Sequence, residues 1–224
     1  SVLFKPLNDF WRYVMHYKIT FWLVMFNIFG FIAEIILLNT NPDLVNSLVF
    51  QPEHLATFNI FPIIASWFMH AGFLHLFGNL LFLFTFGRIV EKHYGIWMPM
   101  VYFTSAIIAD VFSAFFGLGG IGASGAVAGL VAAAILLEPF QLNYMAFGIP
   151  IPMFIVGWLA IAADISGLLV PTDTVINHAA HVGGYASVFL VFLLSKSDMK
   201  KKLQKGALLN FVGLAILTLV VWLI

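Results

Sequence analysis

The stretch 119–134, GGIGASGAVAGLVAAA, places one hydroxyl side chain, that of Ser124, in a run of glycine, alanine and other small apolar residues. Gly125 and Gly129 are four residues apart and therefore share one face of a helix. Small residues at this spacing let two transmembrane helices approach each other closely. Such packing explains the glycines but does not require the serine. The role of Ser124 therefore depends on whether the rest of the chain supplies a base.

The composition is that of a membrane protein. Hydrophobic residues make up 62% of the chain and charged residues 9%, against about 25% charged in an ordinary soluble domain. The formal net charge is zero and no basic face stands out, so the sequence indicates no nucleic-acid partner. The chain has no cysteine, which excludes disulfides, thiolate metal ligands and cysteine nucleophiles.

Apolar runs predict an all-α polytopic membrane protein, because a spanning helix needs about 20 largely apolar residues. Segment 39–72 contains three prolines, which predicts a structured loop at the membrane interface rather than a span. We expect seven spans, near 19–38, 73–91, 97–116, 124–138, 150–169, 175–194 and 206–224.

The positive charges predict the orientation of these spans. All ten lysines and arginines fall into three segments, before the first span, after the second, and between the sixth and seventh. Seven spans place these segments on one side, which the positive-inside rule makes the cytoplasm. We therefore expect a cytoplasmic N-terminal segment 1–18, an external C-terminus and an external 39–72 loop, in the cell membrane. The charges are Lys5, Arg12, Lys18, Arg88, Lys92, Lys196, Lys200, Lys201, Lys202 and Lys205.

A hydroxyl and an imidazole are expected at similar depth. Ser124 begins the fourth span from the outer side, and the sixth span also enters from outside. His181 lies six residues after Val175, which is about 9 Å along a helix. Because a serine hydroxyl is a weak nucleophile without a base, the pair suggests nucleophilic catalysis. A packing serine and a core histidine are the alternative interpretation.

The segment HAGFLHLFGN places His70, His75 and Asn79 at the outer start of the second span. His75 and Asn79 are four residues apart and share a helix face. An amide and an imidazole are suitable donors for the oxyanion that develops during acyl transfer. A zinc site is disfavoured, because the spacing is HxxxxH rather than HExxH and no third ligand is nearby.

These motifs together resemble the rhomboid family of intramembrane serine proteases. The resemblance is carried, in chain order, by HxxxxHxxxN, by VEKHYG after the second span, by GASG at 122–125 and by AHVGG in a late span. It covers roughly residues 19–195, as a six-helix core. Residues 196–224 resemble the basic loop and additional C-terminal transmembrane helix of some members.

The resemblance implies an endopeptidase with a Ser–His dyad that cleaves single-pass membrane proteins near the outer face, without a cofactor or a metal. Ser124 would be the nucleophile and His181 the general base. The resemblance further implies an oxyanion hole of His75, Asn79 and the Ser124 backbone N–H, supported by His70, Gly122, Gly125 and Gly184.

The chain departs from the family pattern beside the candidate base. Many members carry an aromatic residue four positions after the serine, where this chain has Ala128. Tyr185 is a candidate for holding the His181 ring instead, and His178 lies near the same helix face. Many members also carry Trp-Arg in the first loop, where this chain has Phe-Pro at 61–62.

Three acids inside spans, Glu34, Asp110 and Asp164, keep an ion-coupled transporter as an alternative. Against it, no span has paired Gly/Pro breaks at its centre and no internal repeat is visible. A second alternative is a catalytically silent rhomboid-like protein that binds membrane-protein helices. We interpret Asp110 and Asp164 as helix–helix hydrogen-bonding groups, and a dyad implies that replacing either by Asn leaves the serine reactive.

The charge distribution predicts the topology directly. A reporter fused after Asp198 should be cytoplasmic, and one inserted near Asn46 should be external, because every positive charge lies on one side of seven spans. Reporter activity measured in intact cells checks this, and finding both reporters on one side would contradict the seven-span topology.

Overall fold

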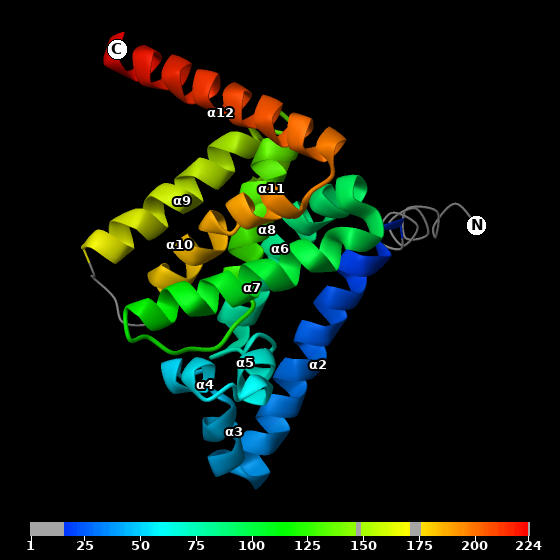
Figure 1. Ribbon diagram of the computed structural model, residues 1–224, viewed down its shortest axis with the longest axis vertical. Coiled ribbons are helices and arrows are strands. Elements are labelled where there is room, and N and C mark those ends of the chain that lie inside the picture. The colour runs from blue at the N-terminus through cyan, green and yellow to red at the C-terminus, as the bar shows by residue number, and fades with distance from the viewer. Residues whose placement is uncertain (1–15, 147–148, 171–175, 224) are drawn as a thin grey trace.

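In the computed structural model, residues 16–146, 149–170 and 176–223 are described, and they form a bundle of helices with one short β-hairpin (Figure 1). The elements in chain order are α2 (Lys18–Thr40), α3 (Pro42–Leu48), α4 (Pro52–Ala56), α5 (Ile60–Ser66), α6 (Phe73–Tyr94), η2 (Gly95–Trp97), α7 (Met98–Phe115), α8 (Ser124–Leu137), β1 (Leu142–Ala146), β2 (Ile149–Pro152), α9 (Met153–Leu169), α10 (His178–Ala186), α11 (Val188–Leu194) and α12 (Ser197–Leu223).

The predicted spans correspond to these helices. The stretches Lys18–Thr40, Phe73–Phe115 and Ser197–Leu223 are long and apolar enough to cross a membrane, the second of them comprising α6, η2 and α7. Shorter apolar helices are Ser124–Leu137, Met153–Leu169 and His178–Leu194. The chain is therefore an all-α polytopic membrane protein with a six-helix core and a seventh, C-terminal helix, as predicted.

Two helix starts and one predicted span differ from the sequence-based expectation. The fifth helix begins at Met153 rather than 150, because residues 149–152 pair with β1 in an antiparallel hairpin. The last helix begins at Ser197, so the segment expected to be a basic loop is helical, in keeping with the helix propensity of its Lys, Leu and Gln residues. The sixth span is two helices that meet at Ser187, and the N-terminal segment 1–15 lies outside the described residues.

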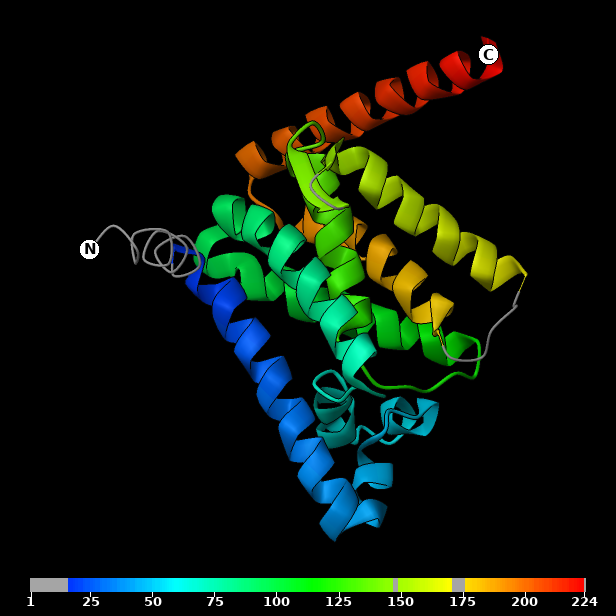
Figure 2. The same cartoon turned by 180° about the vertical axis from the view of Figure 1, so that it is seen from behind.

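Helix α8 is the centre of the bundle, with α6, α7, α9 and α10 around it (Figures 1 and 2). Every residue of α8 except Ser124 and Leu136 is buried. At Gly129 an added Cβ would overlap the Ser105 hydroxyl of α7 and lie 2.9 Å from the Ser187 hydroxyl. Those two hydroxyls are themselves hydrogen-bonded at 2.7 Å. The crossing of the central helix with its neighbours therefore requires glycine.

The last helix is attached to the core by polar contacts as well as by packing. Asn210 is 2% exposed, and its amide donates to the carbonyl of Ile135 at 2.7 Å. The indole of Trp158 in α9 donates to the Asn210 side-chain oxygen at 3.0 Å. Since Asn210 is buried, its hydrogen bonds specify where α12 sits.

Glu91, the acid of the VEKHYG motif, anchors the start of α2. Its carboxylate accepts the backbone N–H groups of Ile19 at 3.0 Å and Thr20 at 2.8 Å. These N–H groups belong to the first turn of a helix and have no intrahelical acceptor. A negative charge at this end also favours the helix dipole.

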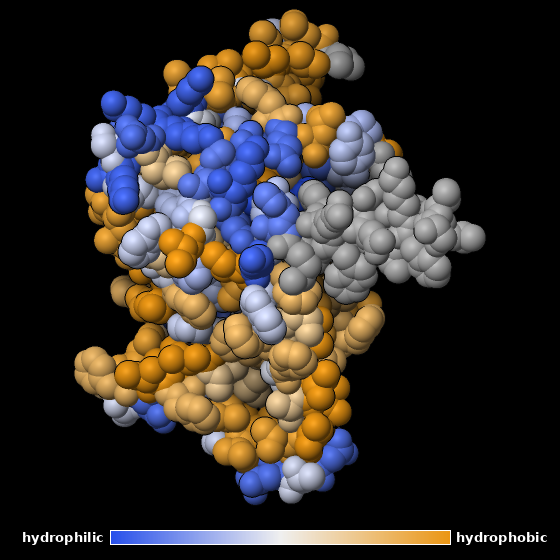
Figure 3. Space-filling view, turned by 90° about the vertical axis from the view of Figure 1, so that its right-hand side faces the viewer, coloured by the Kyte–Doolittle hydropathy of each residue, from blue (hydrophilic) through white to orange (hydrophobic). Residues whose placement is uncertain are grey.

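The positively charged helix ends lie together. Lys92 at the end of α6 pairs with Glu138 after α8 at 3.0 Å, and Lys202 in the first turns of α12 lies 2.9 Å from the His93 ring. On the face in Figure 3, an apolar band separates a large hydrophilic region in the upper half of the view from small hydrophilic patches at the lower end. The charged ends of α6 and α12 therefore lie together as expected, while Lys5 and Arg12 fall outside the described residues.

Segment 39–72 is structured at the opposite end of the bundle, as α3, α4 and α5. Phe50 forms an antiparallel bridge with Gly120, and the Gly122 N–H donates to the Ser66 carbonyl at 2.8 Å. The Trp67 indole donates to Asp110 of α7 at 2.7 Å. The segment therefore closes on the loop that precedes Ser124.

The glycine packing makes a testable prediction. Gly129→Ala should lower the free energy of unfolding by about 1–3 kcal/mol, because overpacking forces neighbouring helices apart. Gly78→Ala is the matched control, since a Cβ on that α6 residue would meet nothing within 4 Å. Thermal unfolding in detergent measures both, and equal midpoints for the two variants would contradict this account of the core.

Candidate active site

Ser124 is the first residue of α8, so its backbone N–H has no acceptor within the helix. The side chain is partly exposed. It lines a cavity between α7, α8 and α10 and the loops that lie beside segment 39–72. The positive end of the helix dipole and free N–H groups make such a position suitable for an anion. Other residues lining this cavity are Trp67, Asp110, Gly122, Asn177 and Ala180.

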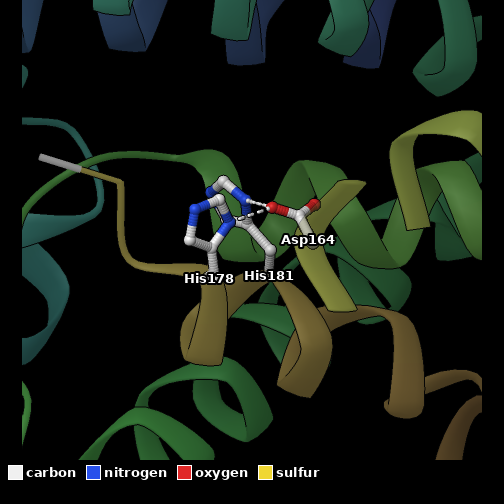
Figure 4. A group of neighbouring side chains, drawn as sticks. All are labelled: Asp164, His178 and His181. Carbon is white, nitrogen blue, oxygen red and sulfur yellow. Dashed lines mark hydrogen bonds and ion pairs between the residues drawn. The ribbon is translucent and has the colours of Figure 1, made fainter. Parts of the chain in front are cut away.

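His181 lies in α10, and its ring is held by an acid from α9. The Nδ1 atom is 2.7 Å from the Oδ1 atom of Asp164 (Figure 4). An ionised carboxylate only accepts hydrogen bonds, so Nδ1 carries the proton in this arrangement. The neutral ring then keeps a lone pair on Nε2, which is the atom that can act as a base.

Asp164 has two further partners. The Nδ1 atom of His178 lies 2.8 Å from the same Oδ1 atom, and the Tyr185 hydroxyl donates to Oδ2 at 2.7 Å. The interpretation of Asp164 as a helix–helix hydrogen-bonding group is therefore confirmed, with the candidate base as one partner. Tyr185 contacts the acid that holds the His181 ring, so its support of that ring passes through Asp164.

The sequence did not pair Asp164 with His181, because 17 residues separate them. The available signal was a carboxylate in an apolar span, which is costly unless it has a partner. The other two intramembrane acids also have partners. Asp110 accepts from Trp67, and Glu34 accepts the backbone N–H of His70 at 2.7 Å.

Close packing brings the Ser124 helix against the His181 helix. A Cβ at Gly184 would overlap the carbonyl of Gly125 and lie 2.9 Å from the Ala128 Cβ. Gly184 therefore permits the approach, and so close a contact leaves no room for an aromatic ring at position 128. Within the described residues no hydrogen bond joins Ser124 to His181. Catalytic hydrogen bonds often form only when substrate is bound.

His75 presents a donor beside this site. Its Nδ1 atom accepts the backbone N–H of Ala71 at 3.3 Å, so the neutral ring carries its proton on Nε2. That edge of the ring faces Gly122, where an added Cβ would lie 2.9 Å from Nε2. Gly122 has a φ of +125°, which L residues rarely adopt. The glycine thus lets the His75 ring approach within two residues of Ser124.

The other two predicted residues of the HxxxxHxxxN motif are buried. Asn79 donates one side-chain N–H to the backbone carbonyl of His75 at 2.9 Å, and its role toward a substrate stays a prediction. The His70 ring is 2% exposed and packs edge-on against the rings of Phe31 and His75. In the described structure neither ring nitrogen of His70 has a hydrogen-bond partner.

One group of side chains has the composition of a metal site. The ligand atoms of Asp164, His178 and His181 lie within 4.8 Å of one another. The sequence predicted no metal, and its weak zinc candidate was the separate pair His70 and His75.

The fold defines the protein as a polytopic helical membrane protein in which Ser124, His75 and His181 lie near one end of a tightly packed bundle. The chain belongs to the rhomboid family: residues 57–197 match the Rhomboid domain. The match contains the HxxxxHxxxN, GASG and AHVGG motifs and ends at the start of α12.

Similar proteins are rhomboid-like proteins of Arabidopsis thaliana. The chloroplastic Rhomboid-like protein 11 is 27% identical over 211 residues, which cover 84% of this chain and 70% of that protein. The mitochondrial RHOMBOID-like protein 12 is 26% identical over 164 residues, covering 64% of this chain and 48% of that protein. RHOMBOID-like protein 1 is 30% identical over 132 residues, covering 56% of this chain and 33% of that protein.

Proposed function

We propose that the protein is an intramembrane serine endopeptidase, with Ser124 as nucleophile and His181 as general base. The observation that supports this most strongly is the hydrogen bond from His181 Nδ1 to Asp164. It orients the ring and reserves the Nε2 lone pair, on a helix packed against the one that begins at Ser124. A histidine that only filled space would not need this support.

In the proposed reaction, His181 Nε2 takes the proton of the Ser124 hydroxyl as the oxygen attacks the scissile carbonyl. The imidazolium that forms is stabilised by the ionised Asp164, and it then donates its proton to the leaving amine. Water deprotonated by the same nitrogen hydrolyses the acyl-enzyme. Asp164 is a positioning residue here, so the proposal departs from a dyad that needs no acid.

The oxyanion of the tetrahedral intermediate would lie near the start of α8. The Ser124 backbone N–H and the His75 Nε2–H are donors that can bind the oxyanion without a change in the backbone. Asn79 is the third candidate donor. Donors prearranged in a site shielded from water stabilise developing negative charge more than water does. Gly122 leaves room for the His75 ring beside Ser124, and Gly125 lets the start of α8 pack against Ala109 of α7.

We further propose that the substrates are single-pass membrane proteins, cut near the outer ends of their helices. Ser124, His75 and His181 all lie at the end of the bundle opposite the lysine-rich helix ends. With those lysines in the cytoplasm, the site faces the outer side of the cell membrane. Water for deacylation then has a short path to the acyl-enzyme.

A serine-directed fluorophosphonate tests the nucleophile and its base. The detergent-solubilised protein should be labelled, and labelling should vanish in Ser124→Ala and nearly vanish in His181→Ala, because the unassisted hydroxyl is a weak nucleophile. In Asp164→Asn an amide N–H can face Nδ1 and favour the wrong tautomer, a change that costs about 10⁴-fold in a soluble serine protease. We expect the labelling rate to fall at least about tenfold.

Asp110→Asn is the matched control, because Asp110 is also a buried acid in a span but accepts a hydrogen bond from the Trp67 indole instead of from His181. Folded wild-type protein that does not react would support the catalytically silent binder. If Asp164→Asn is labelled at the wild-type rate, Asp164 does not position His181 for catalysis and has a structural role only.

Removing an oxyanion donor should slow cleavage of a transmembrane substrate. His75→Ala and Asn79→Ala should each lower kcat by about 10²–10³, with a smaller change in KM, since the donors act on charge that develops in the transition state. Initial rates in proteoliposomes measure this. Wild-type kcat in a folded Asn79→Ala would remove Asn79 from the oxyanion hole.

A further inference from the structure

Asp164, His178 and His181 converge from two helices, and catalysis as proposed uses only two of them. Both imidazole Nδ1 atoms lie against one carboxylate oxygen, at 2.8 Å and 2.7 Å (Figure 4). His178 and His181 are three residues apart and so share a face of α10. A second histidine on the same oxygen is not needed to orient the first.

The donor set suits a divalent transition metal. Two imidazole nitrogens and one carboxylate oxygen are ligands that Zn²⁺ takes, at about 2.0–2.2 Å, with a fourth position left for water. Tetrahedral bonds of this length separate ligand atoms by about 3.4 Å, so the two nitrogen–oxygen distances would have to open by about 0.6 Å. Rotation of the Asp164 carboxylate and the two rings can supply that change.

Neighbouring residues orient these three side chains. The Tyr185 hydroxyl donates to Oδ2 of Asp164, the oxygen that contacts neither histidine, at 2.7 Å, and this hydrogen bond orients the carboxylate. The His178 ring lies so close to Gly167 of α9 that an added Cβ there would overlap it. The side chains of His178, His181 and Asp164 are 14%, 19% and 11% exposed, so an ion can reach them.

We propose that Asp164, His178 and His181 bind one Zn²⁺ ion and that this ion reversibly inhibits the protease. The inhibition rests on the proposed function, and it follows from the chemistry of the His181 imidazole. A metal bound at Nδ1 takes the lone pair there, and the proton of neutral His181 must move to Nε2. An Nε2 atom that carries a proton cannot accept one from Ser124.

The binding half is tested without any proteolysis. Full-length Ser124→Ala protein in detergent is titrated with Co²⁺, whose visible absorption reports tetrahedral coordination, and Zn²⁺ is then added to displace it. We expect one ion per chain. His178→Gln and Asp164→Asn should each weaken binding by more than about tenfold, since even outer-shell changes at metal sites cost about 10–100-fold.

Two controls match these variants. His54→Gln changes a histidine of α4 outside the cluster, and Asp110→Asn changes another intramembrane acid. Both should bind Co²⁺ and Zn²⁺ as tightly as the Ser124→Ala protein does. Zn²⁺ should raise the thermal unfolding midpoint of the Ser124→Ala protein, but not when His178→Gln is added to it. Absence of one-to-one binding to folded protein, or binding unchanged by His178→Gln, overturns the proposed site.

The inhibition half is tested by fluorophosphonate labelling of protein with native Ser124. Each variant is compared with itself, with and without Zn²⁺, so differences in its basal rate do not matter. Zn²⁺ should suppress labelling of the wild type, a chelator should restore it, and His178→Gln should lose most of this sensitivity. Zn²⁺ that binds but leaves labelling unchanged overturns the inhibition. Failure of the protein to label at all contradicts the proposed function, while the Co²⁺ titration still decides the metal site.

Discussion

The structure depends on how closely the central helix approaches its neighbours. Side chains at Gly125, Gly129 and Gly184 would overlap atoms of the facing helices, and these contacts set the separation of α7, α8 and α10. In a membrane, helix association has little hydrophobic driving force, so close van der Waals contact and polar bonds must supply it. The same closeness brings the start of α8, which carries Ser124, against α10, which carries His181.

The acids within the bundle are arranged so that each carboxylate has hydrogen-bond partners. Asp164 receives two imidazoles and a phenol, Asp110 receives an indole, and Glu91 receives the first N–H groups of α2. An unpaired polar group in hydrocarbon costs several kcal/mol. The acids that first suggested ion transport are therefore part of the helix packing, and one of them also holds the candidate base.

The packing around His181 also shows how this chain manages without an aromatic residue at position 128. Ala128 lies against Gly184, and a ring there would push α10 away from α8. The support of His181 comes instead from Asp164 of α9, whose other carboxylate oxygen accepts from Tyr185 of α10. A carboxylate that fixes the tautomer can also share a metal, which an aromatic ring cannot do.

The sequence by itself determined the membrane class, the seven apolar segments and the motif residues of the family, since these follow from composition, length and short spacing. The N-terminal bounds of α9 and α12 were wrong, because strand pairing at 149–152 and the helix propensity of a lysine-rich segment override hydropathy. Only the tertiary structure decided that Asp164 bonds His181 and that His75 faces Gly122. Those contacts join residues on different helices, and no local pattern specifies which helix faces which.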